Sequence, residues 1–201
     1  MYEYPEHIEK LTAVFRQFPG IGRRAAERIV TSLLDWLPEQ IDDFGTLVSE
    51  LPERIGTCAE CGAYCDKNTL CPVCADPKRN PKLLCMVENT AQLMSIECGG
   101  RYNGRYLVLG GKISPISRDM GGNLNLELLK TKAFSGTVEE IIMALGGDVE
   151  SRATVSFITE MLQNAPVKIS RPATGLPAGA NLSFADAATI AAAFDARVAL
   201  K

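Results

Sequence analysis

The 201-residue chain has one histidine, one tryptophan and no long apolar run. Its one histidine, His7, lies near the N-terminus, so a metal site elsewhere in the chain would have to use other ligands. No apolar stretch approaches the roughly 18 residues that a membrane span needs. The net charge is only −3, which excludes a strongly basic chain, so any surface that attracts nucleic acid must be local.

Signals for export and for disulfide formation are also missing. The first residues carry neither a basic segment nor the apolar segment of a signal peptide. The seven cysteines are an odd number, which fits a reducing compartment better than a disulfide framework. Hydrophobic residues at 46% and charged residues at 22% are ordinary globular values. We therefore expect a folded cytoplasmic protein of one or two small domains, without a membrane segment.

A compact cysteine cluster stands near the middle of the chain. Two Cys-x-x-Cys pairs are separated by nine residues: Cys58, Cys61, Cys71 and Cys74. Two such pairs facing each other across a short loop form the tetrahedral thiolate cage of structural zinc sites. We therefore predict one structural zinc ion per chain, in a knuckle over residues 56–76. Because a knuckle of this size has no core of its own, the metal would supply its folding energy, roughly 10–16 kcal/mol in comparable peptides.

Other interpretations of these cysteines are a redox dithiol, a disulfide staple or four unrelated buried thiols. A redox Cys-x-x-Cys normally occurs once, at the start of a helix, whereas here there are two, with Gly62 and Pro72 at turn positions. One ambiguity remains inside the loop, where Cys65 could replace Cys61 as a ligand. The symmetry of the two pairs favours Cys65 as a spectator. The segments before and after the knuckle are then expected to be separate units.

The segment before the cysteines, residues 1–55, has the apolar spacing of helices. A helix over 6–17 is followed by the turn Pro19-Gly20-Ile21-Gly22 and by a second helix, which begins near Arg23 and is stopped by Pro38. A third helix, around 44–51, is expected to close the unit before Pro52. Two helices joined by Pro-Gly-Ile-Gly resemble a helix-hairpin-helix motif, in which glycines let the backbone approach a phosphate.

The local charge agrees with contact to a phosphate. Residues 10–28 hold five basic side chains against one acid, so one end of this unit is positive despite the negative total. Hairpins of this type contact the nucleic-acid backbone, so binding should be independent of sequence and sensitive to salt. The alternative is an ordinary helical hairpin whose glycines only form a turn. The predicted DNA-binding residues are Lys10, Gly20, Gly22, Arg23, Arg24 and Arg28.

After the cysteines the pattern alternates between strands and helices. Strands are predicted over 83–87, 106–109, 140–145 and 167–170, and helices from Asn89 or Thr90, over 124–134 and over 152–162. This alternation predicts an α/β domain, residues 82–176, with a parallel sheet and helices on its faces. Residues 177–201 are expected to form a C-terminal tail and helix.

Three acids follow predicted strands of this sheet. Glu88 ends the first strand, and Asp148 and Glu150 follow the third. Because the carboxyl ends of parallel strands meet at one edge, these carboxylates could together hold Mg²⁺. They could equally be solvent-facing loop acids, and the spacing does not decide between the two. A phosphate-binding P-loop is excluded, because Tyr106 stands where its first glycine should be.

The order of these parts resembles the RecR family of bacterial recombination mediators, whose α/β portion is a Toprim domain. The resemblance rests on the Pro-Gly-Ile-Gly hairpin, the four-cysteine knuckle and Leu-Cys-Met-Val-Glu at 84–88. It continues in Tyr-Asn-Gly-Arg-Tyr-Leu-Val-Leu-Gly-Gly at 102–111, Ile-Ser-Pro at 113–115 and Arg-x-Ala-x-Gly-Leu-Pro-Ala-Gly at 171–179. The match is collinear over nearly the whole chain.

The resemblance implies a non-enzymatic DNA-binding protein that acts with RecO, and in some settings RecF, to load recombinase onto gapped or single-stranded DNA. It implies ring-like homo-oligomers whose hairpins face the DNA. Carried over by residue, the four cysteines would bind zinc and Arg23 and Arg24 would face the DNA. Glu88 would belong to the acidic face that contacts RecO, to which we add Asp148 and Glu150.

The chain also departs from the family pattern. Where the family usually has Asn-Pro-Thr-Val-Glu-Gly-Glu-Ala-Thr, residues 146–154 read Gly-Gly-Asp-Val-Glu-Ser-Arg-Ala-Thr. The chain has gained Asp148, and Arg152 replaces an acid, which indicates a divergent member. The alternative from another class is a Mg²⁺-dependent Toprim nuclease or topoisomerase-like enzyme that uses Glu88, Asp148 and Glu150. A third interpretation is a zinc-dependent adaptor that does not contact DNA.

Overall fold

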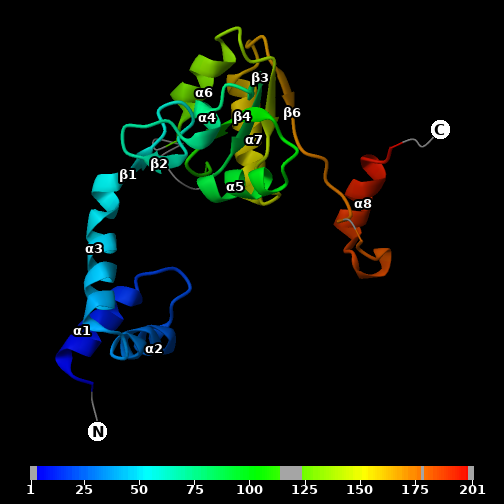
Figure 1. The fold of residues 1–201 in the computed structure, drawn as a ribbon. Helices are drawn as coiled ribbons and strands as arrows, with labels where there is room; N and C mark the ends of the chain where they lie inside the picture. The colour runs from blue at the N-terminus through cyan, green and yellow to red at the C-terminus, as the bar shows by residue number, and fades with distance from the viewer. Residues whose placement is uncertain (1–3, 114–123, 178, 199–201) are drawn as a thin grey trace. The chain divides into compact units, whose positions relative to one another are not determined.

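The computed structural model describes residues 4–113, 124–177 and 179–198 (Figure 1). It divides the chain into two compact units, Met1–Arg54 and Ile55–Lys201. Three motif residues quoted above, Ser114, Pro115 and Ala178, lie outside the described residues. Among the described residues, no helix combines the length and the apolar character that crossing a membrane requires.

The N-terminal unit contains three helices, α1 (Glu6–Phe15), α2 (Arg23–Leu33) and α3 (Pro38–Arg54). The first two form the predicted hairpin, with Thr12 of α1 and Ala26 and Val30 of α2 buried. The turn between them follows the glycines, since Gly20 has a φ of +78°, a conformation in which a Cβ would be strained.

Two helix boundaries in this unit were predicted wrongly. The second helix does not run to Pro38 but ends at Leu33, and Pro38 begins α3 instead. A proline suits the first turn of a helix, where its missing N–H would be unpaired in any case. The third helix does not end before Pro52 but continues to Arg54, with Pro52 in its last turn. There the proline interrupts hydrogen bonding only at the end of the helix.

The third helix also fails to close the unit as expected, because it contains no buried residue. Its apolar side chains are exposed within the chain: Phe44, Leu47, Val48 and Leu51.

The second unit is built on a four-stranded sheet. Its strands are β3 (Asn80–Val87), β4 (Gly104–Val108), β5 (Glu140–Met143) and β6 (Lys168–Ser170), in the order β4-β3-β5-β6. All three pairs are parallel, as predicted, with Cys85 of β3 opposite Tyr106 on one side and Ile142 on the other. Helices α5 (Thr90–Cys98), α6 (Leu126–Ala133) and α7 (Val149–Met161) connect the strands (Figure 1).

Alternation along the strands separates two hydrophobic layers, because successive side chains point to opposite faces. One face packs against α5 and the cysteine knuckle, through Cys85, Val87, Tyr106 and Val108. The other face packs against α6 and α7, through Leu84, Met86, Leu107 and Leu109. The sheet is therefore covered on both faces, and the knuckle contributes to one of the two layers.

Polar contacts fix the two helices nearest the carboxyl edge of the sheet. Helix α5 is capped by Asn89, as predicted, whose side chain accepts from the Gln92 N–H at 3.0 Å. Helix α7 begins at Val149 rather than at Arg152, because Asp148 caps it by accepting from the Ser151 N–H at 2.9 Å. Sequence periodicity did not reveal this cap.

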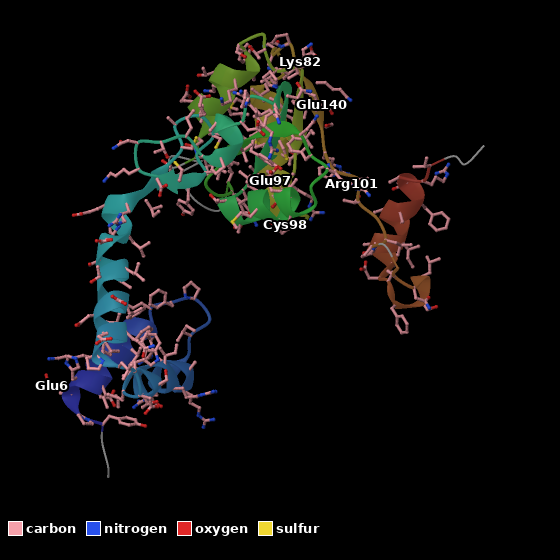
Figure 2. All side chains as sticks on the ribbon, in the orientation of Figure 1. Glu6, Lys82, Glu97, Cys98, Arg101 and Glu140 are labelled. Atoms are coloured by element: carbon pink, nitrogen blue, oxygen red, sulfur yellow. The ribbon has the colours of Figure 1, made fainter. Side chains whose placement is uncertain are left out.

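A half-buried ionic contact joins the segment after the knuckle to α5. Both terminal nitrogens of Arg79 donate to the carboxylate of Glu97, which is labelled on α5 in Figure 2. The hydroxyl of Tyr106 on β4 donates to the same carboxylate at 2.6 Å. The hydrogen bond from Arg79 lowers the pKa of Glu97, so the pair remains charged at neutral pH.

The predicted C-terminal helical segment is confirmed. A short 3₁₀ turn, η1 (Leu182–Phe184), is followed by α8 (Ala187–Asp195). Asp186 caps α8 by accepting from the Thr189 N–H at 2.9 Å.

Candidate metal centre and nucleic-acid interface

The four predicted cysteines come together in the structure. Their sulfur atoms all lie within 4.8 Å of one another, and the side chains are buried. The Sγ atoms of Cys61 and Cys71 are 3.5 Å apart. A tetrahedral ion with metal–sulfur bonds of 2.3 Å needs sulfur–sulfur distances of about 3.8 Å, so the cage fits such an ion. Among the described residues, these cysteines form the group whose ligand atoms lie close enough to hold a metal.

Short elements hold the two pairs in place. The first pair follows β1 (Ile55–Thr57), which pairs with β2 (Tyr64–Asp66) in an antiparallel ribbon. The second pair brackets the start of the one-turn helix α4 (Pro72–Ala75), where the Cys71 sulfur accepts from the Cys74 N–H at 3.4 Å. Cys65 points elsewhere, because its thiol donates to the Thr69 carbonyl at 3.3 Å. The structure thus leaves Cys65 out of the group, as the symmetry of the pairs indicated.

The four cysteines can be fully ionised only in the presence of a cation. A hydrogen bond from Cys61 lowers the pKa of Cys74 to about 6, and the same bond raises the pKa of Cys61 far above its usual value. One thiolate is therefore stabilised at the expense of its neighbour. Four thiols this close together can all ionise only when a cation neutralises the mutual repulsion of the resulting thiolates.

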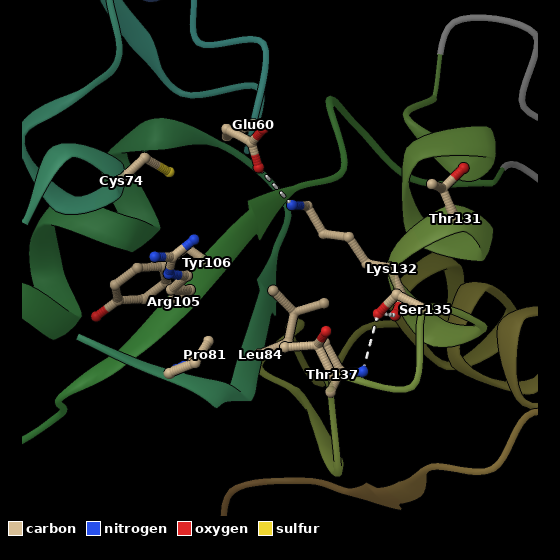
Figure 3. Close-up of a pocket in the computed structure, with 11 residues that line it drawn as sticks. Glu60, Cys74, Pro81, Leu84, Arg105, Tyr106, Thr131, Lys132, Ser135 and Thr137 are labelled. Carbon is tan, nitrogen blue, oxygen red and sulfur yellow. Dashed lines mark hydrogen bonds and ion pairs between the residues drawn. The ribbon is translucent and has the colours of Figure 1, made fainter. Parts of the chain in front are cut away.

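The knuckle is fastened to the sheet rather than separate from it. The Val108 N–H at the end of β4 donates to the Cys61 carbonyl at 2.7 Å. Lys132 of α6 reaches Glu60 at 3.0 Å, the contact dashed in Figure 3. Beside this contact lies a cavity of about 280 Å³, lined by residues of the knuckle, β3, β4 and α6. The segments before and after the knuckle fall in different units, and the knuckle itself belongs to the second, where its cysteines share a hydrophobic layer with the sheet.

Gly62 makes this close approach possible. Its φ is +76°, and a Cβ added there would lie 2.5 Å from Nδ2 of Asn125 and 3.0 Å from the Val108 carbonyl oxygen. Only glycine satisfies both the backbone conformation and the contact. The sequence indicated a turn at Gly62 but gave no sign of what the turn packs against.

The predicted phosphate-facing hairpin presents an open helix N-terminus. Gly22 is the N-cap residue of α2 and offers no side-chain cap, so the first N–H groups of α2 have no intrahelical partner. A Cβ built at Gly20 or at Gly22 would meet nothing within 4 Å, so the surface beside both glycines is open. An unsatisfied helix N-terminus of this kind attracts anions.

The basic side chains near the hairpin differ in how free they are. Arg23 donates to Glu27 at 2.8 Å and lies 3.7 Å from Glu9 of α1, and the hydrogen bond to Glu27 raises its pKa. Lys10 pairs with Glu6 at 2.7 Å.

Two arginines of the same helix are available instead. Within the described residues, Arg24 and Arg28 have no recorded partner, and both are exposed. Because they are four residues apart, they lie on the same face of α2. Sequence counting could not separate these two free arginines from the paired cations.

The predicted acidic residues meet only in part. Glu88 and Asp148 both contact Lys112, which follows β4, at 3.4 and 2.9 Å. Glu150 lies exposed in the first turn of α7, and no contact of its carboxylate is recorded in the part of the chain that the structure describes. Sequence reasoning missed Lys112, although its place after Gly110 and Gly111, at the end of a predicted strand, was a usable signal.

The parallel sheet has an acid at the end of its first strand and a four-cysteine cluster, consistent with a structural metal, against one face. These features fit a Toprim-domain protein. Residues 82–173 match the family model described as Toprim domain, and residues 175–198 match the model RecR, C-terminal.

Curated relatives cover almost the entire chain. The Recombination protein RecR of Bifidobacterium adolescentis is 37% identical over 98% of both chains. That of Nitratidesulfovibrio vulgaris is 34% identical over 94% of this chain and 95% of its own. The chain belongs to the RecR family.

The distinction between ligand and spectator cysteines is testable. We expect Cys61→Ser to lose the bound metal, because it removes one of four thiolates from the cage. Cys65→Ser should retain it, since the Cys65 thiol donates to the Thr69 carbonyl and lies outside the four-sulfur group. Metal content per chain, measured by mass spectrometry of the purified variants, decides between them. Metal loss in Cys65→Ser with retention in Cys61→Ser would reverse the assignment.

A second prediction concerns the contact between the knuckle and the sheet. Gly62 and Gly100 both have positive φ, but an added Cβ at Gly100 would meet nothing within 4 Å. Gly100→Ala should therefore cost only the backbone strain, roughly 1–2 kcal/mol. Gly62→Ala should cost clearly more and speed metal release to a chelator. Equal losses in chemical denaturation would show that the approach to Asn125 is unimportant.

Proposed function

We propose that this protein is a DNA-binding recombination mediator, which acts with RecO and RecF to load recombinase onto gapped or single-stranded DNA. The observation that carries the proposal is the uncapped N-terminus of α2 beside two exposed, unpaired arginines, Arg24 and Arg28. Family membership supports it, since the relatives carry the name recombination protein.

The DNA contact would be made to the phosphate backbone. Gly20 and Gly22 leave room for a phosphate at the helix N-terminus, and Arg24 adds a charge in the first turn of α2. Arg23 would first have to leave Glu27, which lowers its net contribution. The same holds for Lys10 and its partner Glu6. Binding of this kind is independent of base sequence and weakens with salt.

The metal is proposed to be one structural zinc ion per chain. A closed set of four thiolates without an open position is the arrangement that structural zinc sites use. When bound, the ion would supply no chemistry and would hold the knuckle against the sheet. The odd number of cysteines, seven, supports a reducing cytoplasmic location.

A homo-oligomer is supported by the uncovered apolar face of α3. Leu47 and Leu51 lie one turn apart on this helix and are 67% and 55% exposed within the chain. A second copy of the chain would cover such a face. Several hairpins held in one assembly would also raise the effective concentration of weak phosphate contacts.

The acidic edge of the sheet is the proposed surface for RecO. Glu88 borders a cavity of about 440 Å³ that also contains Gly110, Gly111 and residues of the knuckle. Glu150 adds an exposed carboxylate and Asp148 a partly exposed one. A basic side chain of the partner would suit this edge.

We propose that the protein has no catalytic activity. Metal-dependent phosphoryl chemistry needs carboxylates that converge on the ion, and Glu150 does not join Glu88 and Asp148. Incubation with gapped duplex DNA, with and without Mg²⁺, tests this proposal. Salt-sensitive complexes with intact strands support a mediator, whereas Mg²⁺-dependent nicking that Glu88→Gln abolishes would contradict it.

The arginine assignment leads to a specific prediction. Arg24→Ala should weaken binding to every DNA sequence alike and reduce the salt slope by about 0.9 per lost phosphate contact on duplex DNA. Arg23→Ala should have a smaller effect, because Glu27 and Glu9 already occupy that side chain. Fluorescence anisotropy titrations over a range of salt concentrations measure both.

The matched control is Arg54→Ala, which removes an arginine paired with Glu50 on α3 of the same unit. Its binding should stay close to that of the unsubstituted chain. If all three substitutions weaken binding equally, the effect comes from total charge and not from the hairpin.

The oligomer proposal predicts the effect of charge on α3. Leu47→Glu combined with Leu51→Glu should shift the assembly to smaller species, because two carboxylates cannot be buried unpaired in an apolar interface. Leu34→Glu, at a residue 69% exposed outside α3, is the control. Light scattering coupled to size-exclusion chromatography gives the masses, and unchanged masses for the α3 variant would remove this helix from the interface.

A further inference from the structure

Three charged side chains meet at the carboxyl ends of three adjacent strands. In the order β4-β3-β5, Lys112 follows β4, Glu88 follows β3 and Asp148 follows β5. The Lys112 Nζ lies 2.9 Å from Oδ2 of Asp148 and 3.4 Å from Oε2 of Glu88. The side chains of Lys112 and Glu88 are each 21% exposed and that of Asp148 is 49% exposed, so the group is half-buried at Lys112 and Glu88 and open to solvent at Asp148.

The two carboxylates are held in place by further hydrogen bonds. Asp148 caps α7, with Oδ1 accepting from the Ser151 N–H at 2.9 Å and Oδ2 from the Ser151 hydroxyl at 3.1 Å. Glu88 exchanges two hydrogen bonds with Gln92, one of them from the Gln92 amide to Oε2 at 3.2 Å. Three of the four carboxylate oxygens are thereby engaged.

The lysine is positioned as firmly as the acids. On its N-terminal side, the Gly110 N–H donates to the Glu88 carbonyl at 2.9 Å. On its C-terminal side, the Ile113 N–H donates to the buried Thr154 hydroxyl of α7 at 2.9 Å. The segment that carries Lys112 is thus tied to both elements that carry the acids. The hydrogen bond to Asp148 raises the pKa of Lys112, so its ammonium stays charged at neutral pH.

This arrangement does not fit the Mg²⁺ that a Toprim sheet could be expected to hold. Mg²⁺ demands a near-octahedral shell of oxygens at 2.0–2.1 Å. Here an ammonium group contacts both carboxylates that would have to supply those oxygens. A divalent ion would have to displace Lys112 and break its contacts with both acids.

We propose that Lys112 is a built-in cation, which takes the place of a divalent ion between Glu88 and Asp148 and closes this edge of the sheet to Mg²⁺. The positive charge that joins the three strand ends is then covalently part of the chain. The carboxylate pair needs no cofactor, and its geometry does not respond to the concentration of divalent ions. The inference concerns this edge alone and stands apart from DNA binding by the hairpin.

The test is metal binding by the full chain with its cysteine centre loaded. Mn²⁺ serves as the probe, because the electron paramagnetic resonance signal of the free ion reports how much is bound. In the unsubstituted chain no Mn²⁺ site should depend on Glu88, so Glu88→Gln should leave the amount of bound Mn²⁺ unchanged. Lys112→Ala should gain one site per chain, with affinity higher by tenfold or more, on the order of 1.4 kcal/mol per factor of ten. Adding Asp148→Asn to Lys112→Ala should abolish the gained site.

Two further variants guard the interpretation. Lys112→Met keeps a long side chain without the charge and should gain the same site, which separates loss of charge from loss of packing. Lys82→Ala removes a lysine from an exposed pair with Glu139 on the same domain, and should behave like the unsubstituted chain. Circular dichroism melts establish that each variant is folded.

Two results would overturn the proposal. The first is a Mn²⁺ site in the unsubstituted chain that Glu88→Gln removes, and this measurement needs no Lys112 variant to fold. The second is a folded Lys112→Ala or Lys112→Met chain that gains no site. In that case the contacts of Lys112 with Glu88 and Asp148 would be ordinary ion pairs that contribute little to stability.

Discussion

The mutual repulsion of four buried thiolates is the constraint on which much of the second unit depends. As thiolates, Cys58, Cys61, Cys71 and Cys74 can remain within 4.8 Å of one another only if a cation balances their charge. The knuckle they form is bonded to the end of β4 and covers part of one sheet face, beside α5. A metal ion bound by these cysteines would therefore also stabilise a hydrophobic layer of the Toprim domain.

The parts of the fold that the sequence predicted are those set by local pattern. Alternating strands and helices predicted the parallel sheet, and two Cys-x-x-Cys pairs predicted the cage. The parts that it did not predict depend on contacts between distant residues. Nothing near Gly62 in sequence indicates Asn125, which lies against it, and nothing near Asp148 indicates Lys112. Pro38 and Pro52 were misjudged for another reason. A proline is tolerated in the first turn of a helix, and Pro52 lies so close to the end of α3 that its missing N–H removes only one hydrogen bond of the last turn.

In the hairpin, too, the sequence did not reveal which charged side chains pair with each other. Counting residues 10–28 gave five basic side chains against one acid, but Glu6 and Glu9 lie just outside that window and pair with basic residues inside it. Of the predicted DNA-binding cations, Arg24 and Arg28 remain without a recorded partner among the described residues. A DNA phosphate binds an unpaired cation most strongly. A cation that already pairs with a carboxylate must first break that contact, so the net gain is only the difference between two similar interactions.

At the carboxyl edge of the sheet, too, the charged groups are already paired within the chain. Glu88 and Asp148 lie where a Toprim sheet could hold a metal, yet both already contact an ammonium group. In the proposed arrangement the edge keeps its geometry without a divalent ion, and its net charge is the sum of two acids and one lysine. A partner with basic side chains would then be attracted less by Glu88 and Asp148 than by acids that Lys112 does not pair with, such as Glu150, which is exposed in the first turn of α7.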